Sequence, residues 1–455
     1  KNLNNLTNSP VLFFGNEFFD AIPIKQFKRT KKNILECFIK INNEGNIEKI
    51  FHKTSVSNKK KINSYLFIYL LILLFFSYFF LFIKHNVGND STISEWLINY
   101  EGGFTKRGLI GQLTIELSRI FDSNLRWVIF LLQSFACTVY FFLLFVFFKN
   151  LKFERIIILS IFTPIFILYP IAEIEVLARK EVLVFSLYIT YLMIPRDSNF
   201  KLFSLSIFSL LSILVWEPIL FFFPLIIILE IIKNNIEKIN FIFLKLILSF
   251  IPSLLAVFFI IMFPLSIDEH NSMVFILKQE FGEDCYMACN LLISKSSIIQ
   301  QFQGNFGKYS LEVFIRYSLI FLIGFFPLIS LLNNSSLKNK NLVLFKFFEK
   351  PIILILISLL PIIVLFAMGY DWGRWVNVTY VMLALTYFHL LKSGNFILNY
   401  KKLENNLIYK IKGKIFIIFF IIFCFGWNPK TVITGDIASF PGYRIPYKVF
   451  KILSH

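Results

Sequence analysis

The sequence predicts an all-α integral membrane protein of about eleven transmembrane helices, preceded by a short α/β or β-hairpin fragment. Hydrophobic residues make up 56% of the 455 residues, 59 residues are phenylalanine, and the mean hydropathy is +0.69. One soluble core cannot absorb this much apolar surface. The apolar residues form stretches that approach or reach the roughly 20 residues that a helix needs to cross hydrocarbon. These stretches are 65–83, 127–148, 156–172, 182–194, 202–216, 218–232, 241–264, 312–332, 352–369, 376–391 and 415–427.

The lysine distribution predicts the orientation, because cytoplasmic loops retain positive charge during insertion. The run Lys59-Lys60-Lys61 precedes the first stretch and predicts a cytoplasmic N-terminus. The expected inside segments are lysine-rich, at 149–155, 195–201, 233–240, 333–350 and 392–414. The expected outside segments, which include the C-terminus, are 84–126, 173–181, the Trp216-Glu217 corner, 265–311, 370–375 and 428–455.

Several stretches are short, which predicts little tilt, local thinning of the bilayer, or hairpins that do not fully cross it. Residues 202–232 allow two interpretations: one long helix broken at Pro218, or two helices in a hairpin. The hairpin is preferred because a single helix would move the later lysines, such as Lys338 and Lys350, outside. A re-entrant hairpin at 156–194 would leave the later orientation unchanged.

The net charge of +18 does not require nucleic acid as a partner, because inside-loop lysine next to anionic lipid explains most of it. There are 36 Lys and 10 Arg, a bias typical of an AT-rich genome. Seven of the 10 Arg nevertheless lie in or next to outside segments. The planar arginine fork suits phosphate or carboxylate. The alternative is that these arginines snorkel or pair with loop acids.

The first outside loop carries the densest polar motif, Asn99-Tyr100-Glu101-Gly102-Gly103-Phe104-Thr105-Lys106-Arg107-Gly108-Leu109. Paired glycines let the backbone approach a ligand, and Glu101 lies close in sequence to Lys106 and Arg107. An amphipathic helix is expected from Leu109 to Ile120, lying along the interface. A lipid phosphate would suit this loop; the alternative is a glycine turn with an internal salt bridge.

A second motif, Tyr370-Asp371-Trp372-Gly373-Arg374-Trp375, lies near the outer end of the 352–369 stretch. Asp371 and Arg374 share a helix face if the 376–391 helix starts early. The tryptophans then offer faces for a sugar ring while Arg374 holds a phosphate. The alternative is an aromatic belt with a local ion pair.

Two further places carry charge in apolar surroundings. Residues 173–181 hold five ionisable residues, including Arg179 and Lys180, and charge below a membrane surface is functional by default. The alternative is a solvated loop. Glu217 lies between Trp216 and Pro218 and has no cation near it in sequence. It is expected either to bind substrate or to be a protonated acid that donates a hydrogen bond to a backbone carbonyl.

The two motifs together resemble a group of uncharacterised bacterial polytopic proteins associated with surface-polysaccharide genes, over residues 65–455. The large first outer loop with an acid is also similar, more loosely, to the GT-C glycosyltransferases. This resemblance implies a polyprenyl-phosphate-linked sugar donor, a bacterial inner membrane, and an acidic base in the first outer loop. Glu101 is the first candidate base and Asp90 the second.

The N-terminal residues differ from the rest of the chain. The run Asn16-Glu17-Phe18-Phe19-Asp20-Ala21-Ile22-Pro23 resembles the NEFFDALP-type motif of the MidA-like S-adenosylmethionine-dependent methyltransferases, and the resemblance covers 10–52. The family's glycine-rich cofactor loop is not part of it. Residues 1–57 are therefore expected to be a non-functional fragment, from a misjoined gene or a truncated fusion, unless the likeness is chance; 58–455 form the membrane domain.

No cofactor or metal is expected, because the chain has no nucleotide-binding or serine-nucleophile motif and no CxxC pattern. Cys285 and Cys289 lie in an outer loop where a disulfide is permitted but not required.

The expected function is sugar transfer from a polyprenyl-phosphate donor, with membrane lipid and this donor as partners. Arg107, Arg179 and Arg374 would hold the phosphate and Trp372 and Trp375 would frame the sugar. The other expected substrate-binding residues are Lys106, Lys180, Glu217 and Asp371. The alternatives are a polysaccharide polymerase, a transporter or flippase of a lipid-linked substrate, and a non-catalytic scaffold.

Overall fold

The structure is a computed structural model, and it describes most of the chain beyond residue 55. The backbone is described at 27–29, 34–41, 47–53, 56–87, 91–152, 154–195, 200–234, 236–237, 241–292, 298–339, 350–433, 450 and 452–454. Side chains are described from Asn63 onward. Asp90 and the motif at 16–23 lie outside the described residues.

The chain divides into two units, Lys1–Tyr65 and Leu66–His455. In the first unit, β1 (Phe27–Arg29), β2 (Ile34–Ile41) and β3 (Ile47–Lys53) form an antiparallel sheet in the order β1-β2-β3. The β2–β3 register runs from Leu35 opposite Lys53 to Ile41 opposite Ile47. The hairpin expected in this fragment is therefore present.

The second unit is built from helices, and α1 enters it from the first unit. The α-helices are α1 (Val56–Val87), α2 (Ser91–Leu97), α3 (Gly108–Ile120), α4 (Leu125–Phe148), α5 (Arg155–Phe162), α6 (Tyr169–Ala172), α7 (Glu181–Met193), α8 (Lys201–Val215), α9 (Phe223–Asn234), α10 (Phe241–Leu248), α11 (Ile251–Met262), α12 (Ile267–Phe281), α13 (Met287–Asn290), α14 (Ile298–Phe306), α15 (Leu311–Asn333), α16 (Pro351–Ser358), α17 (Ile363–Met368), α18 (Trp372–Lys392), α19 (Tyr400–Glu404), α20 (Leu407–Lys410) and α21 (Gly413–Phe425). Short 3₁₀ helices are η2 (Ile174–Val176), η3 (Glu217–Phe222) and η4 (Leu360–Ile362). The short strands β4 (Ser335–Leu337) and β5 (Phe396–Leu398) pair antiparallel.

Among the described residues, five helices are long and apolar enough to cross a membrane. They are Asn63–Asn86, Leu125–Phe148, Phe241–Met262, Leu311–Asn333 and Pro351–Met368. The apolar helices α7, α8 and α21 are shorter. The eleven predicted spans are thus not confirmed. The described residues support a mostly helical membrane protein with five candidate spans.

The predicted helix 156–172 is wrong as one continuous helix, because it is divided into α5 and α6. Thr163 has ψ 140° at the end of α5 and precedes Pro164. A residue before proline is disfavoured in the helical region, and proline has no backbone N–H to donate. The break therefore follows from the local sequence.

Residues 202–232 turn back on themselves, as the preferred interpretation expects. Trp216 is extended, with φ −158° and ψ 96°, and η3 follows it. The Nζ atom of Lys201 lies 3.4 Å from Oε1 of Glu230, so the start of α8 lies beside the end of α9. The two helices therefore form a hairpin with Glu217 at its corner.

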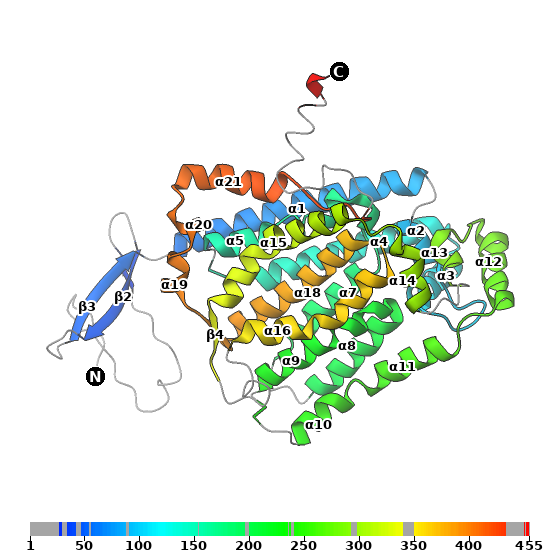
Figure 1. Cartoon of the computed structure of the whole chain (residues 1–455), viewed down its shortest axis with the longest axis horizontal. Coiled ribbons are helices and arrows are strands. Elements are labelled where there is room, and N and C mark those ends of the chain that lie inside the picture. The colour runs from blue at the N-terminus through cyan, green and yellow to red at the C-terminus, as the bar shows by residue number, and fades with distance from the viewer. Residues whose placement is uncertain are drawn as a thin grey trace, which may run out of the picture. The chain divides into compact units, whose positions relative to one another are not determined.

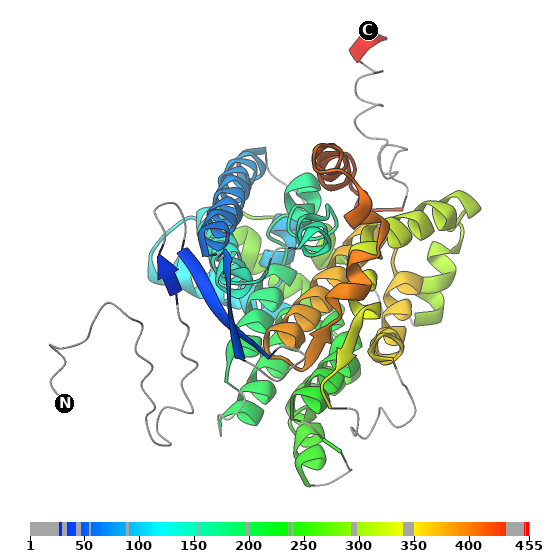
Figure 2. The same ribbon diagram turned by 90° about the vertical axis from the view of Figure 1, so that its left-hand side faces the viewer.

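Helix α18 forms the centre of the bundle. It starts four residues before the predicted stretch, is buried along nearly its whole length, and packs against α7, α9 and α15. Figure 1 shows α2, α3, α12 and α13 at one end of the bundle and β4 and α19 at the opposite end. Figure 2 looks from the β4 end, so that α16 and α21 are seen nearly end-on.

Residues from three of the expected inside segments lie together at one end of the bundle. At the end that carries β4 and β5, which we name the sheet end, the Arg155 guanidinium donates to the carbonyl of Ile411 at 2.7 Å. These contacts join the expected inside segments 149–155, 333–350 and 392–414. The opposite end, which we name the site end, carries α2, α3 and the N-termini of α7 and α18.

Candidate functional site

Charged side chains from four separate segments meet at the site end. Glu95 lies on α2, Arg107 precedes α3, Arg179 precedes α7, and Arg374 lies in the first turn of α18. We name these residues and their acidic partners the arginine cluster. Its members are Glu95, Arg107, Arg179, Glu181, Glu217, Asp371 and Arg374.

Glu95 is the carboxylate that all three arginines share. Its Oε1 atom lies 3.2 Å from Nη2 of Arg374, 3.7 Å from Nη1 of Arg179 and 3.9 Å from Nη1 of Arg107. The Glu95 residue is only 4% exposed. Its second oxygen, Oε2, is buried and has no hydrogen-bond partner among the described residues.

Each arginine of the cluster also has an outer partner. Arg107 donates from Nε and Nη2 to the two carboxylate oxygens of Glu217, both at 2.7 Å. Arg374 forms a short, buried ion pair with Glu181. Asp371 lies 3.4 Å from Nη1 of Arg374 and 3.7 Å from Nη1 of Arg179, so the predicted pair of Asp371 and Arg374 on one helix face is present.

Two left-handed backbone positions shape the loops that carry the arginines. Arg107 itself has φ 64°, and Ala178, just before Arg179, has φ 51°. The Ala178 carbonyl accepts a hydrogen bond of 2.9 Å from the Trp96 indole, which ties this loop to α2 next to Glu95. The Lys180 ammonium donates to the Arg107 carbonyl and so joins the two arginine-bearing loops. Non-glycine residues at positive φ are uncommon and persist where surrounding contacts hold them.

The charges of the cluster determine the protonation of its members. Burial alone would raise the pKa of Glu95, but Arg374, Arg179 and Arg107 together hold that pKa well below its usual range. Glu95 is therefore an anion at neutral pH. Burial lowers the pKa of Lys180 to about 7, an effect that Glu95 partly offsets and Arg107 reinforces. Burial also lowers the pKa of the neighbouring Lys106.

A small cavity of about 20 Å³ lies against the cluster, which is room for a water molecule. Arg179, Glu181 and Asn377 form its polar part, and Tyr140 and Phe185 are among its apolar walls. Nε of Arg179 and Oε2 of Glu181 are both buried without a hydrogen-bond partner among the described residues. Buried polar atoms without a protein partner are commonly satisfied by a water molecule or an ion.

The tryptophans of the second motif lie in different surroundings. Trp375 lies 5.1 Å from the Arg374 guanidinium carbon and 6.2 Å from the ring of Trp216. Trp372 instead stacks on Tyr309 at 5.5 Å and donates its indole N–H to the Phe366 carbonyl at 2.7 Å. Both tryptophans are buried, and the ring of Trp375 lies beside the Arg374 guanidinium.

Glu101, the first candidate base, lies in a different network. Its carboxylate accepts hydrogen bonds from Arg119 at 2.8 and 3.1 Å and from Gln112 at 2.7 Å, and Arg119 also binds Glu280. The hydrogen bond from Arg119 lowers the pKa of Glu101, although burial opposes it. We name this group the Glu101–Arg119 network. The structure does not bring Glu101 into the arginine cluster, and Asp90 lies outside the described residues.

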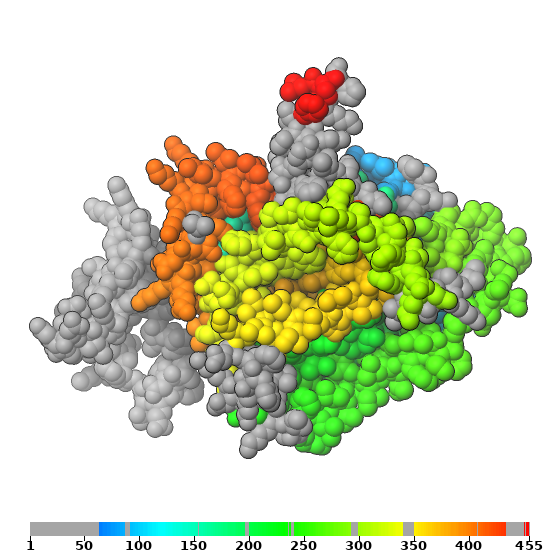
Figure 3. Space-filling model, in the orientation of Figure 1, coloured from blue at the N-terminus to red at the C-terminus, as the bar shows by residue number. Residues whose placement is uncertain are grey.

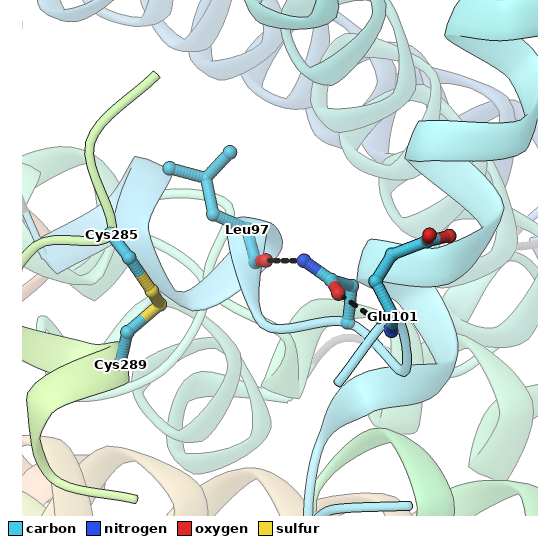
Figure 4. The surroundings of a disulfide bond; sticks show 5 residues. Leu97, Glu101, Cys285 and Cys289 are labelled. Atoms are coloured by element: carbon cyan, nitrogen blue, oxygen red, sulfur yellow. Dashed lines mark hydrogen bonds between the residues drawn. A yellow bond between two sulfur atoms is a disulfide. The ribbon is translucent and has the colours of Figure 1, made fainter. Parts of the chain in front are cut away.

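Cys285 and Cys289 form a disulfide, one of the two alternatives that the sequence allows. Figure 4 shows the disulfide beside Leu97 at the end of α2, with the Glu101 carboxylate directed away from it. Cys289 is fully buried in a small core together with Leu97 and Met273. The disulfide thus belongs to the packing of the site end. Among the described residues, no group of three His, Cys, Asp or Glu could hold a metal ion.

Glu95 is the residue that the sequence interpretation missed. It lies between Ser94 and Trp96, in the same expected outside segment as the first motif, and has no cation near it in sequence. Its Arg374 partner is 279 positions away. The available signal was a single acid in a short, otherwise uncharged helix next to a tryptophan.

Comparison with known proteins gives one match, at the N-terminus. The family described as "Putative S-adenosyl-L-methionine-dependent methyltransferase" matches residues 1–69. This match includes 10–52 and confirms that part of the predicted resemblance. No curated protein and no solved structure matches the chain. The arginine cluster lies beyond the matched residues, and the likeness to GT-C glycosyltransferases stays a prediction.

Proposed function

We propose that this protein transfers a sugar from a polyprenyl-phosphate-linked donor at the outer side of a bacterial inner membrane, in envelope polysaccharide synthesis. The observation that carries the proposal is the convergence of Arg107, Arg179 and Arg374 on one carboxylate. Guanidinium forks match the oxygens of phosphate. Ionisable groups whose pKa is shifted by burial and by neighbouring charges cluster at functional sites.

The lateral face of the bundle supports a lipid-linked substrate. Figure 3 shows a hollow between α15 and α16, with atoms of α18 at its floor. Arg374 lies in the first turn of α18. A polyprenyl chain lying in this hollow would run along the helix whose N-terminal end carries one of the three arginines.

Glu95 is the base that we favour for this reaction. It takes the proton of the acceptor hydroxyl while that oxygen forms a bond to the anomeric carbon of the donor sugar. The bond from the anomeric carbon to the phosphate oxygen breaks, and the polyprenyl phosphate leaves with the electron pair. The sequence favours Glu101 or Asp90 for this role; we prefer Glu95 because it contacts the three arginines, whereas Glu101 lies in the separate Glu101–Arg119 network.

A polymerase differs from this proposal only in its acceptor, whereas a flippase of the same lipid-linked substrate is a different class of function. Buried polar contacts support the flippase as the second candidate. Tyr188 and Thr386 share a hydrogen bond of 2.7 Å, and Lys201 and Glu230 are paired within the bundle. The first contact joins α7 to α18 and the second joins α8 to α9, so buried polar groups also lie away from the arginine cluster.

The proposal is tested with full-length protein in liposomes and a panel of polyprenyl-phosphate-linked hexoses labelled in the sugar. We expect release of polyprenyl phosphate and transfer of the label to an added glycan acceptor. Arg374→Gln abolishes both, while Glu280→Gln, outside the arginine cluster, leaves both unchanged. Movement of the labelled lipid across the bilayer without transfer would support the flippase instead.

A further inference from the structure

We infer that Glu95 occupies the phosphate subsite formed by Arg107, Arg179 and Arg374 as an internal anion, and that a phosphate group displaces it. The inference rests on the proposed function only for the identity of the phosphate-bearing substrate. The subsite itself is assigned from contacts among described residues.

Glu95 is more loosely held than Glu217, and Asp371 lies at similarly long distances from its arginines. Charge-assisted N–H···O hydrogen bonds usually measure about 2.7–2.9 Å. The bidentate pair of Arg107 and Glu217 meets this range at 2.7 Å, whereas Glu95 lies 3.2 to 3.9 Å from its three arginines. It uses a single oxygen for all three, and its second oxygen has no hydrogen-bond partner among the described residues. A carboxylate is a poor fit to this position.

Within the described part of the chain, Arg179 is the arginine of the cluster that lacks short hydrogen bonds to a carboxylate. It is 7% exposed, and its two carboxylate neighbours, Glu95 and Asp371, both lie 3.7 Å away. Its Nε atom is buried without a hydrogen-bond partner among the described residues. A buried guanidinium needs short hydrogen bonds to offset its desolvation. A phosphate has more acceptor oxygens than a carboxylate and can serve several guanidinium groups at once.

Displacement has a consequence for the chemistry of Glu95. The three arginines hold the Glu95 carboxylate in its charged form, and this makes it a weak base. A bound phosphate neutralises the same arginines and places a negative charge nearby, and both effects raise the proton affinity of Glu95. Donor binding thus converts Glu95 into a competent base only when the substrate is present.

The test measures equilibrium phosphate binding to full-length protein in nanodiscs. Two probes are used, inorganic phosphate and decaprenyl monophosphate. Glu95→Gln keeps the shape and removes the competing charge, so we expect about ten-fold tighter binding. Glu280→Gln is the matched control, because Glu280 is also bound to an arginine, Arg119, in a network apart from the subsite. The affinity of Glu280→Gln for both probes is expected to equal that of the wild type.

Arg179→Gln provides a second variant, with about ten-fold weaker binding expected because one guanidinium of the subsite is lost. Tighter phosphate binding by Glu95→Gln supports the inference. A larger gain in affinity for decaprenyl monophosphate indicates a lipid-linked phosphate, and equal gains in affinity for both probes indicate a soluble phosphate. Tighter binding by Glu95→Gln, together with a wild-type protein that transfers no sugar, supports the inference and refutes the proposed function. Unchanged or weaker binding by Glu95→Gln, or unchanged binding by Arg179→Gln, overturns the inference even if sugar transfer is observed.

Discussion

The guanidinium of Arg107 and the carboxylate of Glu217, 110 positions apart in the chain, form two parallel hydrogen bonds of 2.7 Å. The pair joins the loop before α3 to the corner between α8 and α9. Arginine and glutamate side chains are about one-fifth exposed here, at 21% and 23%. The corner of the hairpin is therefore fixed to the loop that supplies one arginine of the candidate phosphate subsite.

We expect this pair to contribute to stability as a unit. A double-mutant cycle with Arg107→Gln and Glu217→Gln should give a coupling free energy of about 1–3 kcal/mol in unfolding experiments in detergent. The matched control is the pair Lys278 and Asp284, which lies at 2.6 Å but is more than half exposed. Its coupling should stay below about 1 kcal/mol. Equal coupling free energies in the two pairs would show that burial of the Arg107–Glu217 pair does not strengthen its interaction.

Lys180 predicts a pH dependence of stability. Its pKa of about 7 in the folded protein lies below its unfolded value, so the unfolded chain binds more protons between these pKa values. Stability therefore rises with pH from about 7 toward 10, and the cost of burying Lys180 is complete below about pH 7. Lys180→Met should remove this rise. Melting temperatures of both proteins across that range give the measurement, and a difference that does not change with pH would contradict the assignment.

Gly373 predicts a packing constraint in the first turn of α18. A Cβ atom at this position would lie 1.9 Å from the Lys430 carbonyl oxygen and 2.7 Å from the Tyr169 hydroxyl. Gly373→Ala should destabilise the protein by about 1–3 kcal/mol, because the core must shift. Gly304→Ala is the control, since a Cβ there meets nothing within 4 Å and helix propensity favours alanine by about 0.5–1 kcal/mol. Equal melting temperatures in the two variants would disprove the close contact.

The disulfide predicts a chemical difference that mass spectrometry detects. Denatured protein is alkylated with and without prior reduction, and we expect reduction to add two alkylated cysteines in the segment that contains Cys285 and Cys289. Because Cys289 is fully buried, a membrane-impermeant reductant applied to intact inner-membrane vesicles of known orientation should reduce this bond slowly, and only when it is applied to the periplasmic face. Reduction from the cytoplasmic face instead would invert the predicted topology.

Some of the site was accessible from the sequence. Asp371 and Arg374 are three positions apart, and an early helix start was enough to place them on one face; the helix starts at Trp372 and the pair is formed. Arg107 and Arg179 were found because outer arginine is unusual in a lysine-rich chain. Local spacing and composition carry information of this kind.

The remainder depends on tertiary contacts that local sequence does not encode. Glu95 has no charged neighbour in its helix, and its role appears only when Arg374, 279 positions later, packs beside it. Trp372 and Trp375 look equivalent in the motif, yet one packs among Tyr309 and Phe366 and the other against Arg374. The length of the predicted 156–172 helix was also overestimated, because Pro164 ends a helix that hydropathy alone would continue.

The most direct measurement is an experimental structure of the full-length protein in nanodiscs with decaprenyl monophosphate bound. We predict phosphate density within hydrogen-bonding distance of Arg107, Arg179 and Arg374, with the Glu95 carboxylate moved away from all three. Phosphate bound elsewhere, or bound while Glu95 keeps its contacts with the arginines, would contradict the assignment of the arginine cluster as a phosphate site.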